Sequence, residues 1–121
     1  MTKEKICALS FQKVFEAITN KALKKNRTKE EVVAVTTWLT GYSEADIQKA
    51  SEDGTTYGDF FQNVPAMNPN RELITGSVCG VKLALIEDPL IKDMRYLDKL
   101  IDELAKGKPL EKVLRKGSEG L

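Results

Sequence analysis

Hydrophobic residues recur every three to four positions along most of this chain, which is the spacing of one face of an α-helix. The pattern is clearest near the C-terminal end, where the intervals are four, three, four and three residues: Leu90, Met94, Leu97, Ile101 and Leu104. Asp88 and Pro89 stand where an N-cap and a first helical position are expected, and Gly107 ends the pattern. We therefore predict a helix over about 88–107, and a short last helix opened by residues 108–109.

The first half of the chain predicts four more helices, each preceded by a hydroxyl side chain that can cap it. These expected N-caps are Ser10, Thr28, Ser43 and either Thr55 or Thr56. Thr28 and Glu31 have the spacing of a capping box. Asn26 and Gly41 are expected to end the first two helices, since both residue types tolerate a left-handed backbone.

Residues 72–86 are ambiguous, because a run of hydrophobic residues interrupted by glycines is equally typical of a buried helix and of a strand. We prefer a helix, since a lone strand among helices would leave its backbone amides without partners. The chain as a whole predicts an all-α fold: a compact, single-domain orthogonal bundle of about five to six short helices over 1–121, with residues 1–8 and 117–121 frayed.

Charge and composition exclude several classes of function. The net charge is +1, which indicates neither a nucleic-acid nor a membrane partner. The longest uncharged run, 32–43, is short of the roughly 20 residues that cross a bilayer, so no membrane span is expected. Cys7 and Cys79 lie far apart in the sequence, and two cysteines in a chain of this size suit a reducing compartment better than a secreted protein. This favours a cytoplasmic location.

Common catalytic machinery is missing from the sequence. The chain has no histidine and no glycine-rich phosphate loop, so histidine-activated nucleophiles, most zinc sites and the usual nucleotide cradles are excluded. We expect no cofactor and no metal. An enzyme here would depend on carboxylates, on lysine or on a lone thiol.

Polar and small residues gather in one segment between the predicted helices, residues 68–80. The candidate binding residues are Asn68, Asn70, Arg71, Thr75 and Cys79. Arg71 can grip a carboxylate or phosphate through two parallel bonds, and Cys79 would be reactive if its pKa were lowered. The structural alternative, which we favour for the individual residues, is that the asparagines cap a loop, Arg71 pairs with an acid such as Glu87, and Cys79 fills the core.

A basic stretch at residues 21–29 offers a weaker alternative site. It carries five positive charges and no negative one, which suits RNA or an acidic partner, but it has no aromatic residue on which a base could stack. A solvated helix end is the preferred interpretation, because cations at a helix C-terminus complement its dipole. Nucleic-acid binding is therefore not expected to be the main function.

Three strings resemble a known family: NPNRELITGSVCGVK, IEDPL and RYLDKLIDELAKGKPLEKVLRK. They are similar to the bacterial family of small cytosolic proteins called domain of unknown function 2200, and RTKEEV and WLTGY resemble its earlier half. Ala84 and Leu85 depart from the acidic residues expected there. The resemblance implies a compact, all-α fold and supplies no activity, cofactor or catalytic residue.

These observations favour a non-enzymatic binding or protein-interaction module that uses segment 68–80. A homodimer through exposed hydrophobic residues around Tyr96 is one form of this hypothesis. The alternatives are a thiol- or carboxylate-based enzyme around Cys79, with Glu87 or Asp88 as acid or base, and weak nucleic-acid binding through residues 21–29.

Overall fold

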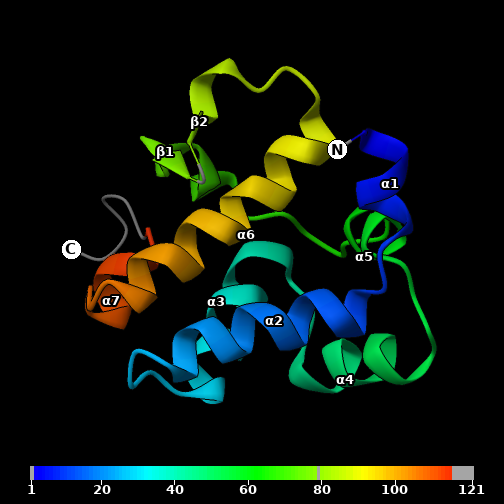
Figure 1. The fold of residues 1–121 in the computed structure, drawn as a ribbon, viewed down its shortest axis with the longest axis horizontal. Helices are drawn as coiled ribbons and strands as arrows, with labels where there is room; N and C mark the ends of the chain where they lie inside the picture. The colour runs from blue at the N-terminus through cyan, green and yellow to red at the C-terminus, as the bar shows by residue number, and fades with distance from the viewer. Residues whose placement is uncertain (1, 79, 116–121) are drawn as a thin grey trace.

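Helix α6 (Pro89–Ala105) crosses the middle of the molecule, and most other elements pack against it (Figure 1). The computed structural model describes residues 2–78 and 80–115. Within these residues the expected all-α fold is confirmed, and its β-structure consists of a two-stranded sheet and an isolated bridge between Ser10 and Thr56. The other helices are α1 (Lys3–Ala8), α2 (Phe11–Leu23), α3 (Lys29–Thr40), α4 (Glu44–Glu52), α5 (Tyr57–Gln62) and α7 (Leu110–Val113).

The helix boundaries follow the capping residues that the sequence indicates. Thr28 and Glu31 form both bonds of the capping box at the start of α3, and the hydroxyl of Thr56 accepts a bond at the start of α5. Asp88 accepts bonds from the backbone amides of Leu90 and Ile91 and so opens α6. The backbone of Asn26 is left-handed, with φ of 64°, as expected of a residue that ends a helix.

The N-terminal segment differs from its expectation. Residues 1–8 were expected to be frayed, but Lys3–Ala8 form helix α1, which packs on α5. The hydroxyl of Thr2 caps this helix, and the ammonium of Lys3 lies 2.8 Å from a carboxylate oxygen of Asp88. This helix makes seven α-helices in the described residues, rather than five to six. The expectation for 117–121 lies outside those residues.

The preference for a helix over residues 72–86 is wrong. This segment contains a short hairpin, β1 (Ser77–Val78) and β2 (Val81–Lys82), between the 3₁₀ helices η1 (Pro69–Leu73) and η2 (Leu83–Leu85). The two strands pair with each other, so the argument from a lone strand does not apply. Gly76 and Gly80 have φ of 94° and 78°, and an α-helix cannot continue through these conformations.

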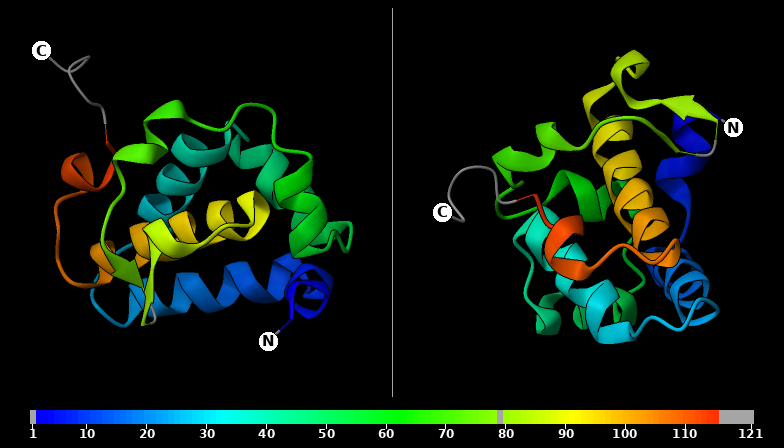
Figure 2. Two further views of the ribbon diagram at one scale, coloured as in Figure 1. Left: turned by 90° about the horizontal axis from the view of Figure 1, so that it is seen from above. Right: turned by 90° about the vertical axis from the view of Figure 1, so that its left-hand side faces the viewer.

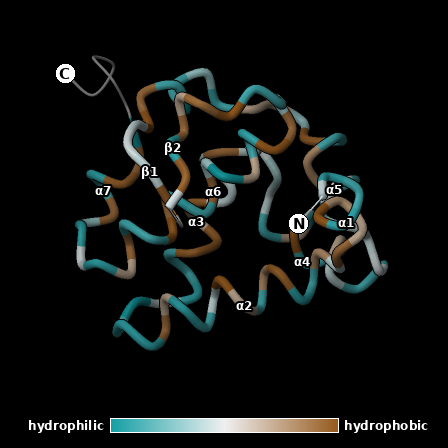
Figure 3. The backbone as a smooth tube through the Cα atoms, turned by 45° about the horizontal axis from the view of Figure 1, so that its top comes forward, coloured by the Kyte–Doolittle hydropathy of each residue, from teal (hydrophilic) through white to brown (hydrophobic). Residues whose placement is uncertain are grey.

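The core lies between α6, α2, α3 and α5, and α2 runs beneath α6 in both views of Figure 2. Along α2 and α6 hydrophobic and hydrophilic positions alternate with the helical period (Figure 3). The rings of Phe11 and Phe60 stack with centroids 3.9 Å apart. Buried Thr36 and Thr40 each donate a hydroxyl bond to a backbone carbonyl one turn earlier, so neither is left unsatisfied.

Tyr96 is buried, with only 5% of its surface exposed. The sequence places it off the main hydrophobic stripe of α6, where it could either cover a neighbouring helix or form part of an exposed interface, and its burial agrees with the first alternative. The hairpin and η2 pack on α6 in addition to the core helices, so residues on more than one of its faces are covered. The dimer hypothesis therefore loses the residue on which it was centred.

In the part of the chain that the structure describes, no helix combines the length and the hydrophobicity needed to cross a membrane.

Candidate functional site

The polar groups of Asn68, the first of the predicted binding residues, form hydrogen bonds within the protein. Its side-chain amide donates to the carbonyl of Trp38 at 3.2 Å, and its backbone amide donates to the carbonyl of Leu39 at 2.9 Å. Its side-chain oxygen accepts from the backbone amide of Asn70 at 2.8 Å. Asn68 thus satisfies carbonyls in the last turn of α3 and begins η1.

Arg71 is also bonded within the protein. Its Nε lies 3.2 Å from Oδ1 of Asp93 on α6, and its Nη1 donates to the carbonyl of Asn68 at 2.9 Å. The acid is Asp93 rather than the expected Glu87, which is exposed. Burial raises the pKa of Asp93, and the charge of Arg71 opposes this shift. Arg71 therefore fastens η1 to α6.

The remaining predicted residues do not complete a site around these two. Thr75 is exposed and Asn70 is half-buried. Cys79 lies outside the described residues, so the thiol hypothesis has no geometry here. Asp88, one of the acids suggested for an enzyme, caps α6 and pairs with Lys3, whose hydrogen bond lowers the pKa of that carboxyl.

A half-open pocket of about 300 Å³ lies where α1, α2, α5 and α6 meet. Five hydrophobic side chains line it: Ile6, Leu9, Val14, Ile91 and Met94. Three polar side chains complete its lining: Tyr57, Arg95 and Asp98. Hydrophobic walls with a few convergent polar groups are the usual composition of a small-molecule site.

Tyr57 is the unusual member of this pocket. It is the first residue of α5, and its backbone amide donates to the carbonyl of Leu9 at 2.7 Å, which fixes its position. The residue is 4% exposed, and its hydroxyl is buried without a hydrogen-bond partner among the described residues. Burial, assisted by the charge of Asp98 and opposed by that of Arg95, raises the pKa of this hydroxyl well above its usual value. The hydroxyl is therefore neutral and unpaired beside an ion pair.

That ion pair joins Arg95 and Asp98 on α6, with Nη1 of the arginine 3.3 Å from Oδ2 of the aspartate. Burial raises the pKa of Asp98, and the charge and hydrogen bond of Arg95 act in the opposite direction. From the sequence alone, an arginine and an aspartate three residues apart on a helix are typical of a surface pair. Tyr57 could not be singled out from the sequence, since nothing in its neighbours shows that its hydroxyl lacks a partner.

Acidic side chains also gather in a second pocket, but they do not form a metal site in the described residues. A second pocket, of about 290 Å³, includes Asp46, Asp53 and Asp59 with Lys49. Over residues 2–78 and 80–115, no three cysteine or acidic side chains gather closely enough to hold a metal ion.

The basic stretch 21–29 is partly neutralised by its surroundings. Lys21 lies 3.3 Å from a carboxylate oxygen of Asp102, and Arg27 lies 2.6 Å from one of Glu31. Two of its five cations are therefore paired within the fold, which weakens it as a nucleic-acid surface.

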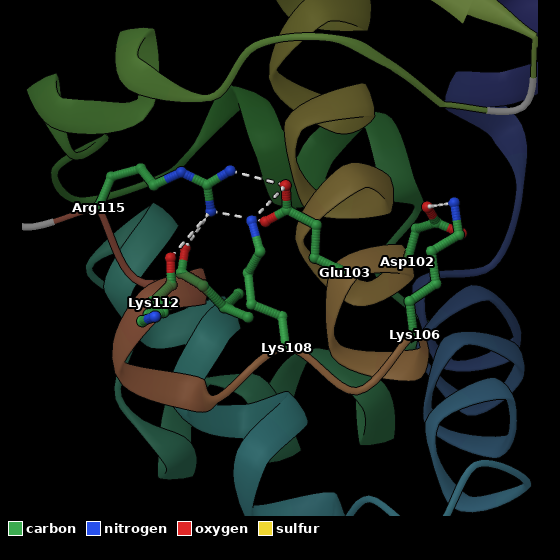
Figure 4. Close-up of polar contacts among 7 residues, drawn as sticks. Asp102, Glu103, Lys106, Lys108, Lys112 and Arg115 are labelled. Atoms are coloured by element: carbon green, nitrogen blue, oxygen red, sulfur yellow. Dashed lines mark hydrogen bonds and ion pairs between the residues drawn. The ribbon is translucent and has the colours of Figure 1, made fainter.

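A further polar cluster lies at the C-terminal end of α6 (Figure 4). The guanidinium of Arg115 and the ammonium of Lys108 both approach the carboxylate of Glu103. Arg115 also donates to the carbonyls of Lys112 and Val113. Its donors are thus directed at protein acceptors, and the cluster holds α7 against α6.

Comparisons with known proteins identify the family but no activity. A search of curated proteins gave no match. Among solved structures, the chain is similar to the crystal structure of uncharacterized protein SP1917, with 43% identity, a TM-score of 0.90 and coverage of 95% of this chain and 94% of the other. The family model described as an uncharacterized protein conserved in bacteria, DUF2200, matches residues 5–115. This chain therefore belongs to the bacterial family DUF2200.

Proposed function

We propose that this protein is a non-enzymatic binding protein, and that it holds a small molecule in the pocket at Tyr57. One observation carries the proposal: Tyr57 lines the pocket, and its hydroxyl is buried without a partner among the described residues. Leaving a buried polar group unpaired costs about 1–3 kcal/mol, and such groups are rare in native proteins. The hydroxyl has almost no accessible surface, so the proposed ligand uncovers it on entry, pairs with it and recovers that free energy.

The pocket suits this role better than segment 68–80. The polar groups of Asn68 and Arg71 already bond to Trp38 and Asp93, and a ligand would have to break those bonds. The Tyr57 hydroxyl has no such bond to give up. We therefore move the proposed binding site from segment 68–80 to the junction of α1, α2, α5 and α6.

The chemistry of the pocket supports binding rather than catalysis. A hydroxyl whose pKa is raised well above its usual value is a poor nucleophile and a poor base at neutral pH. Arg95 and Asp98 form an ion pair, with Nη1 and Oδ2 3.3 Å apart.

We also propose a cytoplasmic location, on the ground that Cys7 is a free thiol.

The test is to purify the protein from its native lysate, release bound small molecules by denaturation, and identify them by mass spectrometry. Wild type and Tyr57→Phe are compared, with Tyr42→Phe as the matched control. The Tyr42 hydroxyl donates to the carbonyl of Phe60, so its removal costs a bond outside the Tyr57 pocket. We expect a compound that accompanies wild type and Tyr42→Phe but is depleted from Tyr57→Phe. Equal recovery from all three proteins, or no compound from any, contradicts the proposal.

A further inference from the structure

We infer that two copies of this chain associate through α2, with the basic C-terminal end of that helix in one copy lying in an acidic groove of the other. The groove lies between α2, the start of α3 and α4, and it is formed by two adjoining pockets of about 280 and 230 Å³. It shares no lining residue with the pocket at Tyr57, so this inference goes beyond the proposed function and does not depend on it.

The groove combines a hydrophobic floor with an acidic rim. Phe15 and Ile47, which are 7% and 3% exposed, line its floor. Four exposed charged side chains also line it, three acidic and one basic: Glu16, Glu44, Glu52 and Lys29. The excess of negative charge favours an occupant that carries cations beside a hydrophobic group.

The C-terminal end of α2 has that composition. Leu23 is 49% exposed, and the adjacent Lys24 and Lys25 are exposed as well. Among the residues that the structure describes, neither lysine forms an ion pair. Covering Leu23 in the groove would remove hydrophobic surface from water, and the two ammonium groups would approach the acidic rim.

The positions of these two features on α2 make the contact self-complementary. Gln12, Glu16 and Thr19 line the groove, and Leu23 continues their stripe along the same face of the helix, at intervals of four, three and four residues. Figure 1 shows α4 beside the N-terminal half of α2, with the C-terminal end of α2 far from it. When two copies meet with their α2 helices antiparallel, the Leu23 end of each lies at the groove of the other. This is the arrangement of a two-fold symmetric dimer.

A second copy is favoured over another basic protein because the chain itself carries both complementary surfaces. The contact is small, since the 13 residues of α2 span only about 20 Å. We therefore expect a weak, reversible dimer whose dissociation constant rises with salt concentration.

Reversing the charges on each surface tests the pairing. One double variant is Lys24→Glu with Lys25→Glu, and the other is Glu16→Lys with Glu52→Lys. Sedimentation equilibrium of the full chain near neutral pH gives the dissociation constant of each variant alone and of their equimolar mixture. Each variant alone should dimerise at least about tenfold more weakly than wild type, because its helix end then has the same charge as its groove. In the mixture every helix end meets a groove of opposite charge, so a heterodimer should form within about threefold of the wild-type constant.

Two further variants separate this contact from general effects of charge. Leu23→Ser should weaken dimerisation about tenfold, because a two-fold contact loses two buried leucines. Lys82→Glu with Lys112→Glu is the matched control, since it changes the net charge as much as the lysine variant of α2 but lies on β2 and α7. This control should dimerise as wild type does. Circular dichroism establishes that each variant is folded, and if a charge-reversed variant is not, Leu23→Ser decides.

Three results would overturn the inference. Wild type that stays monomeric up to about 1 mM has no specific contact of this kind, even where its groove binds a synthetic peptide of residues 21–29. A dimer that Leu23→Ser and both charge reversals leave unchanged uses another surface. A mixture of folded charge-reversed variants that stays monomeric shows that the helix end and the groove do not meet.

Discussion

Arg115 holds Glu103 through two parallel hydrogen bonds, with Nη1 and Nη2 at 2.6 and 2.7 Å from the two carboxylate oxygens. Glu103 is a buried residue of α6, 8% exposed, while Arg115 follows α7. Paired guanidinium and carboxylate groups in this geometry are stronger than single bonds. The pair therefore anchors the end of the described chain to the central helix.

Replacing Arg115 with glutamine should lower the free energy of unfolding by about 2–3 kcal/mol, because the buried carboxylate of Glu103 loses its main partner. Lys108, at 3.5 Å, compensates only in part. Urea denaturation followed by circular dichroism measures the change.

Lys112→Gln is the matched control, since Lys112 is an exposed cation close to Arg115 in sequence. We expect it to change stability by less than about 0.5 kcal/mol. Equal effects of the two substitutions would show that general charge, rather than this ion pair, is responsible.

Glu103 should also make stability depend on pH. Burial raises its pKa, but the hydrogen bond and charge of Arg115, with Lys108 and Lys99, outweigh burial and hold the pKa below its usual value. In the unfolded chain the carboxyl titrates near about 4.3. Its contribution is therefore complete above that value and is lost as the pH falls through the lower, folded pKa. Between about pH 5 and pH 3, wild type should lose more unfolding free energy than Glu103→Gln. Parallel curves would contradict this assignment.

Removing the Tyr57 hydroxyl should leave the ligand-free protein as stable as wild type or make it more stable, by up to about 1–3 kcal/mol. The reason is that Tyr57→Phe deletes a buried polar atom that has no partner among the described residues. Tyr42→Phe should instead destabilise by about 1 kcal/mol, because it deletes the bond to the carbonyl of Phe60. Thermal or urea unfolding of ligand-free protein distinguishes the two. Destabilisation by Tyr57→Phe would reveal a hidden partner.

Two neighbouring asparagines should respond differently to alanine. Asn68→Ala loses a bond to the carbonyl of Trp38 and the cap on Asn70, so we expect a cost of about 1–2 kcal/mol. Asn70→Ala should cost less than about 0.5 kcal/mol, because the bond between these residues uses the backbone amide of Asn70. Unfolding midpoints of the two variants measure the difference. Equal costs would remove Asn68 from its structural role.

Gly58→Ala should loosen α1. The added Cβ would lie 2.6 Å from Cβ of Cys7, which is closer than two such atoms can approach. We expect a loss of about 1–3 kcal/mol and faster hydrogen exchange at the amides of α1. Adding Cys7→Gly removes Cβ and Sγ of Cys7 but leaves its Cα, 3.0 Å from the added Cβ, and should restore part of the protection. Unchanged exchange in Gly58→Ala would show that α1 is not seated on α5 through this contact.

The helices could be predicted because their signals are local. Thr28 with Glu31, and Asp88 with Pro89, mark helix starts through bonds that span at most four residues. The hairpin could not be predicted in the same way, since the hydrophobic pattern of this segment suits a helix and a strand equally. The strand β1 packs against α6, and such a tertiary contact is not visible in the local sequence. Helix α1 was missed because none of its residues is fully buried, so it carries little hydrophobic signal.

The proposed site was hidden from the sequence for a different reason. Tyr57, Leu9 and Asp98 come from three separate elements, and only the fold brings them to one pocket. Asn68 and Arg71 are conspicuous in the sequence because they are polar residues close to prolines. Their partners, Trp38 and Asp93, are 30 and 22 residues away, and no local pattern links them.

The wall of the pocket that α1 contributes has an evolutionary consequence. Ile6 and Leu9 line the pocket of the proposed site, yet helix α1 buries no residue completely. Exchanging these two side chains would reshape the lining at a small cost in folding free energy, whereas exchanging Met94, which is buried, would disturb the core. If family members differ in ligand specificity, we therefore expect the substitutions to lie within the first ten residues.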